Sequence, residues 1–186
     1  MCGIIALLSL SNNNVIDILL AGLKQLQNRG YDSAGVCTMN KEFSMLKYAS
    51  TSKLDSIKQL ENEKLNILNS NIGIAHTRWA THGAKTDENS HPHISYDNKI
   101  SLVHNGIIEN YSELKIMLQN EGIEFKSHTD TEVIVNLLAF NNKDSDNFVD
   151  TIKKTLKMMS GTWGLAIMDL DNPDKLFCVR HGSPLL

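Results

Sequence analysis

The chain has 186 residues, of which 41% are hydrophobic and 21% charged, and its formal net charge is −3. This length predicts one globular domain with enough chain to bury a sizeable core. The sequence has no run of like charges, so its charge pattern does not indicate binding to nucleic acid or to an anionic membrane. The three cysteines are widely spaced and form no C-x-x-C pair, which argues against a disulfide framework or a thiolate zinc site and leads us to expect a cytoplasmic protein.

Short apolar runs predict strands in the first half of the chain, and apolar residues at helical spacing predict helices. In order, the patterns give a strand at 2–10, a helix at 15–28, strands at 33–39 and 43–49, a helix at 53–68 and a strand at 71–77. The first strand is apolar at nearly every position, so we expect it to be fully buried. It is too short to span a bilayer, and no basic residue precedes it as in a secretory signal.

The second half begins with about twenty residues without periodicity, at 78–99. It continues with a strand at 101–106, helices at 112–122, 130–140 and 147–159, and strands at 162–170 and 175–180 joined by the turn DNPD. Strands at both ends with helices grouped between them predict an α+β fold rather than strict βαβ alternation. Because no repeat or linker divides the chain, we expect one domain over residues 1–186.

Cys2, directly behind the start methionine, has two interpretations. It can pack as a small apolar residue at the start of a strand. Alternatively, removal of Met1 would leave a thiol and a free α-amino group on one residue, which would then hold both a nucleophile and a base. Position alone favours the packing role.

The aperiodic stretch also has a functional interpretation, because long loops in compact domains are usually functional or disordered. Its arginine and tryptophan are unusual for a disordered linker. Arg78 could bind a carboxylate through two parallel hydrogen bonds, and Trp79 could cover the site.

Histidines raise the possibility of a metal site in the same region. His76, His82, His91 and His93 lie within eighteen residues. The H-E-x-x-H spacing is absent, however, so a hydrolytic metal site is the weaker interpretation.

Asn105 and Gly106 form the strongest short hairpin signal in the chain. The same pair could instead aim a side-chain amide and a backbone N–H at one point, which is the geometry of an oxyanion hole. The sequence leaves both possibilities open.

Helix ends account for two further motifs. Thr129 and Glu132 predict a capping box at the start of a helix. Asp130 is favoured there by the helix dipole, and its carboxylate could also bind an ammonium group. Arg29 and Gly30 are ordinary residues for a helix end and by themselves indicate no function.

Taken together, MCGIIA, NRGYDSAG, HTRWATHG, ENSHPH, VHNGIIEN, HTDTEV and GTWGLAI resemble the glutaminase domain of the glucosamine-6-phosphate synthase family of class II glutamine amidotransferases. The resemblance runs in order along essentially the whole chain. Other class II enzymes share the leading Cys and an Asn-Gly but differ in the stretches equivalent to RGYDSAG and HTRWATHG. The resemblance implies the N-terminal nucleophile hydrolase fold, a four-layer αββα sandwich of two mainly antiparallel sheets between helical layers, with no cofactor and no metal.

The resemblance also implies a mechanism for hydrolysing the side-chain amide of glutamine. Cys2 attacks the amide once Met1 is removed, and its own α-amino group, with an ordinary pKa of about 7.7–8.0, is the base. Asn105 and Gly106 form the oxyanion hole.

Substrate recognition follows from the same resemblance. Arg78 binds the glutamine α-carboxylate and Asp130 binds the α-ammonium group. The other residues that the resemblance places in or beside the pocket are Arg29, Gly30, His76, Thr77, Trp79, Thr81, His82 and His91.

Enzymes of this family continue into a sugar isomerase part that binds fructose 6-phosphate, and we expect this chain to be the isolated glutaminase domain without it. The expected partners are L-glutamine and, in a full enzyme, that isomerase part, to which ammonia would pass to form glucosamine 6-phosphate. No nucleic acid or membrane partner is expected. The alternative is a catalytically idle regulatory module that binds glutamine or a metal.

Overall fold

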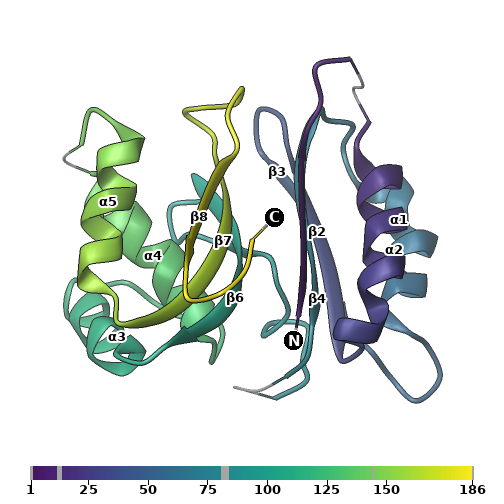
Figure 1. Cartoon of the computed structure of the whole chain (residues 1–186), viewed down its shortest axis with the longest axis horizontal. Coiled ribbons are helices and arrows are strands. Elements are labelled where there is room, and N and C mark those ends of the chain that lie inside the picture. Colours follow the sequence, from purple (N-terminus) through teal and green to yellow (C-terminus); the bar gives the residue numbers. More distant parts are fainter. Residues whose placement is uncertain (1, 12–13, 81–83, 144, 186) are drawn as a thin grey trace.

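Two antiparallel sheets pack face to face between two layers of helices in the computed structural model, which describes residues 2–11, 14–80, 84–143 and 145–185 (Figure 1). The layer order is therefore αββα, as the sequence predicts. No helix within these ranges is long and apolar enough to cross a membrane.

The first sheet has the strand order β1-β4-β2-β3, with every pair antiparallel. Its strands are β1 (Gly3–Leu8), β2 (Ser33–Met39), β3 (Phe43–Ala49) and β4 (Ile72–Arg78), and its helical elements are α1 (Ile16–Leu26), η1 (Gln27–Arg29), α2 (Ser56–Glu63) and η2 (Lys64–Asn66). The apolar faces of α1 and α2 cover the outer face of the sheet, where Leu19, Leu23 and Leu60 are fully buried.

The second sheet has the order β5-β6-β7-β8, again antiparallel throughout. Its strands are β5 (His93–Ile94), β6 (Ile100–Ile108), β7 (Gly161–Asp169) and β8 (Phe177–His181), and the helices on its outer face are α3 (Tyr111–Asn120), α4 (Asp130–Asn142) and α5 (Phe148–Met158). Helix α4 is buried along most of its length because it packs under both the sheet and its neighbouring helices.

The space between the two sheets is filled by a third apolar cluster. Because side chains alternate between the faces of a strand, Val36 points to the helices and Cys37 into the space between the sheets. In the same way Ile74 from β4 and Val103 from β6 face each other's sheet. This cluster brings β4 and β6 together, and their polar ends consequently lie close to one another.

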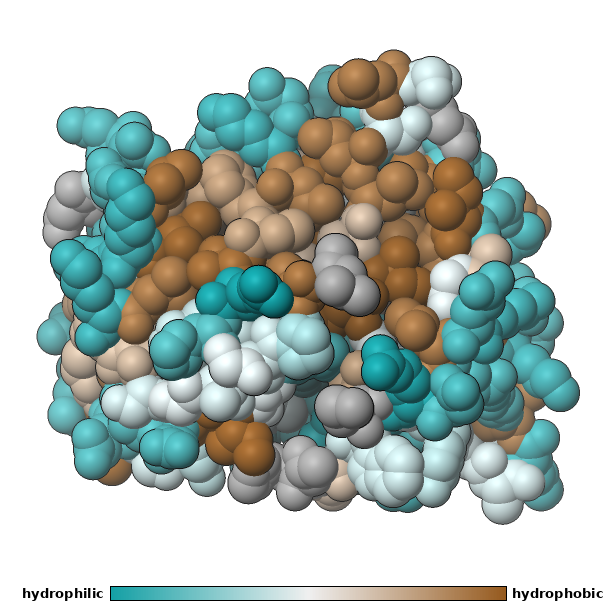
Figure 2. Space-filling model, in the orientation of Figure 1, coloured by the Kyte–Doolittle hydropathy of each residue, from teal (hydrophilic) through white to brown (hydrophobic). Residues whose placement is uncertain are grey.

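Strand β1 differs from its prediction as a fully buried strand. It is an edge strand, and five of its six residues remain partly exposed. Figure 2 shows the resulting apolar surface, which runs over the edge strands β1 and β8. Leu10, just beyond β1, is 99% exposed. An apolar pattern predicts a strand but carries no information on its position in the sheet.

The interpretation of Asn105-Gly106 as a hairpin turn is wrong. Both residues lie inside β6, where they pair with Gly164 and Trp163 of β7. The capping box at α4 is half confirmed, because Thr129 Oγ1 accepts a hydrogen bond from the Glu132 N–H (3.3 Å). The Glu132 carboxylate accepts instead from the backbone of residues 126 and 127, which precede the cap.

Gly35 provides a test of how closely the segment before β5 packs on the first sheet. A Cβ at Gly35 would lie 2.1 Å from the carbonyl oxygen of His91 and 2.6 Å from Lys47 Cβ. We expect Gly35→Ala to lower the free energy of unfolding by about 1–3 kcal/mol, because backbone must move to accept the methyl group. Urea denaturation measures the change.

Gly164→Ala is the matched control, since Gly164 also lies within a strand but its nearest contact would be 3.4 Å away. This variant should change the unfolding free energy by less than about 1 kcal/mol. Equal effects of the two substitutions would contradict the packing described for Gly35.

Candidate active site

Strand alternation carries Cys2 into the space between the sheets. Ile4 and Ala6 of β1 face the second sheet, and Cys2 continues that row. The Gly3 N–H donates to Thr77 Oγ1 (3.1 Å) and the Trp79 N–H donates to Cys2 Sγ (3.2 Å). The end of β4 therefore fixes the position of the sulfur.

Asn105 holds the same residue from the other sheet. Its Nδ2 donates to the carbonyl oxygen of Cys2 (3.0 Å), and His76 Nε2 lies 2.9 Å from its Oδ1. The first contact sets the orientation of the amide, so His76 must donate from Nε2 and is in its Nε2–H form. Within the described part of the chain Nδ2 has no second acceptor, which leaves one N–H for a ligand.

Gly106 follows Asn105 with a φ of 139°, a region that L side chains rarely adopt. A Cβ here would lie 2.0 Å from the carbonyl oxygen of Thr162 on the neighbouring strand. The position therefore requires glycine on both conformational and steric grounds.

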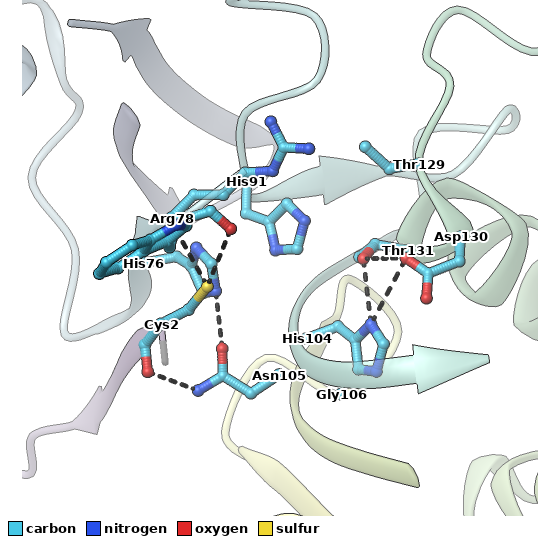
Figure 3. A pocket seen from close by; sticks show the side chains of 11 residues that line it. Cys2, His76, Arg78, His91, His104, Asn105, Gly106, Thr129, Asp130 and Thr131 are labelled. Atoms are coloured by element: carbon cyan, nitrogen blue, oxygen red, sulfur yellow. Dashed lines mark hydrogen bonds and ion pairs between the residues drawn. The ribbon is translucent and has the colours of Figure 1, made fainter. Parts of the chain in front are cut away.

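Two opposite charges share the cavity with the sulfur (Figure 3). Arg78 is only 5% exposed and donates from Nη1 to the carbonyl oxygen of Ala84 (3.4 Å). Burial lowers the pKa of Arg78, while the charges of Cys2, Asp32 and Asp130 act in the opposite direction. Asp130, at the start of α4, accepts a hydrogen bond from the Ile108 N–H through Oδ2 (2.9 Å).

The cavity is small, with a volume of about 40 Å³. Figure 3 shows the Arg78 side chain extending away from the sulfur of Cys2, Asp130 across the cavity, and Asn105 below that sulfur. The residues that line it are Cys2, His76, Arg78, Trp79, His91, His104, Asn105, Gly106, Thr129, Asp130 and Thr131.

Four buried histidines surround the site, and burial keeps each of them neutral. It lowers the pKa of His76 to about 3 and lowers those of His91, His93 and His104 below their usual range. The His76 and His91 rings stack with centroids 4.2 Å apart, and His93 meets His91 edge-on at 5.1 Å. Among the described residues no group of three or more His, Cys, Asp or Glu is arranged to hold a metal ion.

The other residues expected at the pocket lie in different places. Trp79 and His91 line the cavity, and Trp79 is 45% exposed beside the ring of Tyr31. Thr77 instead lies behind Cys2, bonded to the Gly3 N–H. Thr81 and His82 lie outside the described residues.

Arg29 and Gly30 are close to the nucleophile but not in this cavity. Arg29 lines a second cavity of about 290 Å³, which Cys2, Asn105 and Gly106 also border. A Cβ at Gly30 would lie 2.7 Å from the carbonyl carbon of Arg78, so Gly30 permits the close approach of β4.

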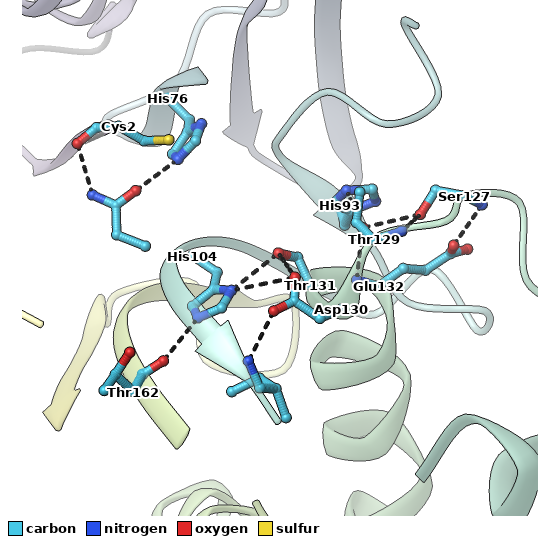
Figure 4. A network of polar contacts seen from close by, with 12 residues as sticks. Cys2, His76, His93, His104, Ser127, Thr129, Asp130, Thr131, Glu132 and Thr162 are labelled. Carbon is cyan, nitrogen blue, oxygen red and sulfur yellow. Dashed lines mark hydrogen bonds and ion pairs between the residues drawn. The ribbon is translucent and has the colours of Figure 1, made fainter. Parts of the chain in front are cut away.

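Three cavity residues were not predicted as part of the site, namely His104, Thr129 and Thr131, and they belong to a polar network around Asp130 (Figure 4). His104 Nδ1 lies 3.1 Å from Thr131 Oγ1 and 3.9 Å from Asp130 Oδ1, and its Nε2 lies 3.4 Å from the carbonyl oxygen of Thr162. Thr129 Oγ1 lies 3.0 Å from His93 Nε2. These three cavity residues are close in the sequence to Asn105 and Asp130, and this closeness could have indicated that they belong to the site.

Asp32 was also missed, although it lies in the RGYDSAG stretch. It is 5% exposed, accepts a hydrogen bond from the Ala80 N–H (2.9 Å) and forms an ion pair with Lys85. Burial raises the pKa of Asp32, but the bonds from Lys85 and Ala80 outweigh it and the net shift is downward. Asp32 therefore stays ionised and anchors the segment that follows β4.

Comparison with known proteins agrees with this geometry. Residues 76–185 match the family described as "Glutamine amidotransferase domain". The match covers more than half of the chain, and the chain belongs to this glutamine amidotransferase family.

Relatives in other organisms carry a more specific name. A glutamine–fructose-6-phosphate aminotransferase (isomerizing) of Buchnera aphidicola subsp. Baizongia pistaciae is 44% identical over 187 residues, which is 100% of this chain and 30% of the relative. One from Thermococcus kodakarensis is 45% identical over 188 residues with the same coverage. The chain thus spans about 30% of the length of the curated relatives it matches.

Solved structures share the fold. The glutamine phosphoribosylpyrophosphate amidotransferase from B. subtilis, complexed with ADP and GMP, superposes with a TM-score of 0.74 at 27% identity, over 91% of this chain and 35% of that one. An allosteric regulatory enzyme of purine biosynthesis gives a TM-score of 0.72 at 27% identity, over 90% and 35%. The N-terminal nucleophile hydrolase fold expected from the sequence is confirmed.

The buried histidines predict a loss of stability in mild acid. Below pH 6.5 the unfolded chain takes up a proton at His76, whereas the folded chain does so only near its pKa of about 3. The contribution of His76 to stability is therefore complete above pH 6.5 and is lost as the pH falls toward 3. At pH 5 the stability lost through His76 amounts to about 2 kcal/mol.

His76→Gln removes this titration and keeps an amide donor near Asn105. Denaturant unfolding at pH 7 and pH 5 should show a drop for the wild type that exceeds the drop for the variant by about 2 kcal/mol. The same drop in both proteins would show that His76 is not held neutral by burial.

Proposed function

We propose that residues 1–186 form a glutaminase domain that hydrolyses the side-chain amide of glutamine to glutamate and ammonia. The observation that carries the proposal is one cavity in which the Cys2 thiol, the Asn105 amide, the Arg78 guanidinium and the Asp130 carboxylate meet. These groups match the reactive amide and the two charges of an amino acid.

Acylation begins once Met1 is removed and Cys2 carries a free α-amino group. This amine accepts the thiol proton and Sγ attacks the amide carbon. The C–N bond then breaks, the ammonium returns the proton to the leaving nitrogen, and ammonia departs from a thioester. The neutral, buried histidines of the site are poor bases, which supports assigning the proton transfer to the amine.

Deacylation uses water, whose proton passes to the same amine while its oxygen attacks the thioester. Glutamate leaves and the thiol is restored. In both steps negative charge develops on the substrate oxygen, and we assign its stabilisation to the free N–H of Asn105 and the backbone N–H of Gly106.

Recognition of the amino acid rests on Arg78 for the α-carboxylate and Asp130 for the α-ammonium group. Both side chains are almost completely buried, so each contact is charge-assisted and poorly screened by solvent. In this proposal the pocket is supported by four further residues, Trp79, His91, His76 and Thr77. Four others remain predicted neighbours of the substrate, namely Thr81, His82, Arg29 and Gly30.

In the full-length polypeptide, we propose that the ammonia aminates fructose 6-phosphate to give glucosamine 6-phosphate. The names of the curated relatives support this, as does the 30% share of their length that the chain spans. The sugar would bind to an isomerase domain outside residues 1–186. Cys2, Cys37 and Cys178 are all free, which supports a cytoplasmic location.

The test follows glutamate and ammonia released by the purified protein, together with the mass of its N-terminus. Wild-type protein lacking Met1 should release both products in equal amounts. Cys2→Ser should fall by at least about a thousandfold in kcat, because a serine hydroxyl is a far weaker nucleophile near neutral pH.

A variant that retains Met1 is the control for the amine, since its thiol is intact but its α-amino group is displaced. It should be as inactive as Cys2→Ser, and normal turnover would contradict the mechanism. Tight binding of glutamine by wild-type protein without ammonia release would instead identify the idle binding module.

A further inference from the structure

Asn89 lies in the segment between β4 and β5 and is only 2% exposed. Both the nitrogen and the oxygen of its side-chain amide form hydrogen bonds. Nδ2 donates to the carbonyl oxygen of Ala84 (3.0 Å), and Oδ1 accepts from the His128 N–H (2.9 Å). The amide therefore bridges two segments that lie far apart in the sequence.

Each end of this bridge adjoins one of the two charged groups proposed to bind the amino acid. The carbonyl oxygen of Ala84 also accepts the hydrogen bond from Arg78 Nη1 (3.4 Å). On the other side, His128 precedes Asp130 by two residues, at the start of α4. The chain of contacts thus runs from Arg78 through Ala84, Asn89 and His128 to Asp130.

Lys47 fixes the backbone on both sides of Asn89. Its Nζ, on β3, donates to the carbonyl oxygens of Glu88 (3.0 Å) and Ser90 (2.8 Å). Burial lowers the pKa of Lys47 to about 8, with Glu132, Glu88 and Asp87 opposing this shift and Arg78 adding to it. At pH 7 the ammonium form still predominates, so both bonds are charge-assisted.

We propose that Asn89 is a positioning residue that sets the spacing between Arg78 and Asp130, an inference that rests on the proposed function. The α-carboxylate and α-ammonium groups of an amino acid are attached to one carbon, so the two groups that bind them must be held at one separation. The Asn89 amide supplies that constraint from outside the cavity, and Lys47 keeps the amide in place.

A role confined to folding predicts a different result from this one. Loss of a merely structural bridge would lower stability and the amount of active protein, leaving KM unchanged. Loss of the spacing between Arg78 and Asp130 weakens binding of the α-substituents and leaves the chemistry at Cys2 intact, so KM rises while kcat is retained.

The experiment compares glutamine kinetics at pH 7 for Asn89→Leu, Asn89→Asp and Lys47→Met. Asn89→Leu removes both hydrogen bonds and should raise KM about tenfold or more, with kcat within about threefold of wild type. Asn89→Asp retains the acceptor for the His128 N–H, so its KM should lie between those of the wild type and Asn89→Leu. Lys47→Met keeps the aliphatic stem and should raise KM in the same direction.

Lys153→Met is the control, because Lys153 is an exposed residue on α5 and its ion pair with Asp150 lies at the surface. It should leave KM and kcat unchanged. Thermal unfolding shows whether each variant is folded at the assay temperature. If Asn89→Leu is unfolded, Asn89→Asp and Lys47→Met decide the question. An unchanged KM in the folded variants, or a fall in kcat alone, would overturn the proposal.

Calorimetric titration of glutamine in the Cys2→Ser background separates this proposal from the proposed function. Adding Asn89→Leu should weaken binding about tenfold whether or not the wild type turns over. Unchanged binding would overturn the role of Asn89 alone. Failure of the Cys2→Ser protein to bind glutamine would overturn the substrate assignment, and the role of Asn89 with it.

Discussion

The bond from Asn105 Nδ2 to the carbonyl oxygen of Cys2 joins β6 of one sheet to the start of β1 in the other. Much of the candidate site depends on it. The other end of the same amide holds His76, whose ring stacks on that of His91. A short polar chain therefore fixes the nucleophile, one wall of the cavity and the donor group together.

This contact is possible because of the apolar cluster between the sheets. Val103 and Ile74 set the separation of β6 and β4, and side-chain alternation then brings Asn105 and His76 into the same layer. The core and the candidate site are thus consecutive parts of the same strands. A change in the packing of the two sheets would therefore move Asn105 relative to Cys2.

Much of the fold could be predicted from the sequence because its signals are local. The spacing of apolar residues in α1 and α5, and the turn between β7 and β8, require no knowledge of the rest of the chain. The burial of β1 could not be predicted, because its exposure depends on its place at the edge of a sheet. The hairpin at Asn105-Gly106 failed for a similar reason, since pairing with β7 outweighed the local turn preference.

The central site residues were predicted from the resemblance of their motifs to a known family. Residues whose contacts lie far away in the sequence were missed. Asn89 bonds to a backbone group 39 positions away, and nothing in its immediate surroundings indicates that partner. Asp32 and His104 could have been noticed from their motifs, but their contacts with Lys85 and Thr131 depend on the assembled fold.

The most direct measurement is covalent labelling with a glutamine analogue in which a chloromethyl ketone replaces the amide. A nucleophilic sulfur displaces the chloride, and intact mass with peptide mapping locates the adduct. We expect one adduct per chain, on an N-terminal Cys2, with Cys37 unmodified because it is fully buried and its pKa is raised to about 12. Labelling of Cys178 with Cys2 unmodified, or no adduct on folded protein, would contradict the assignment of Cys2 as the nucleophile.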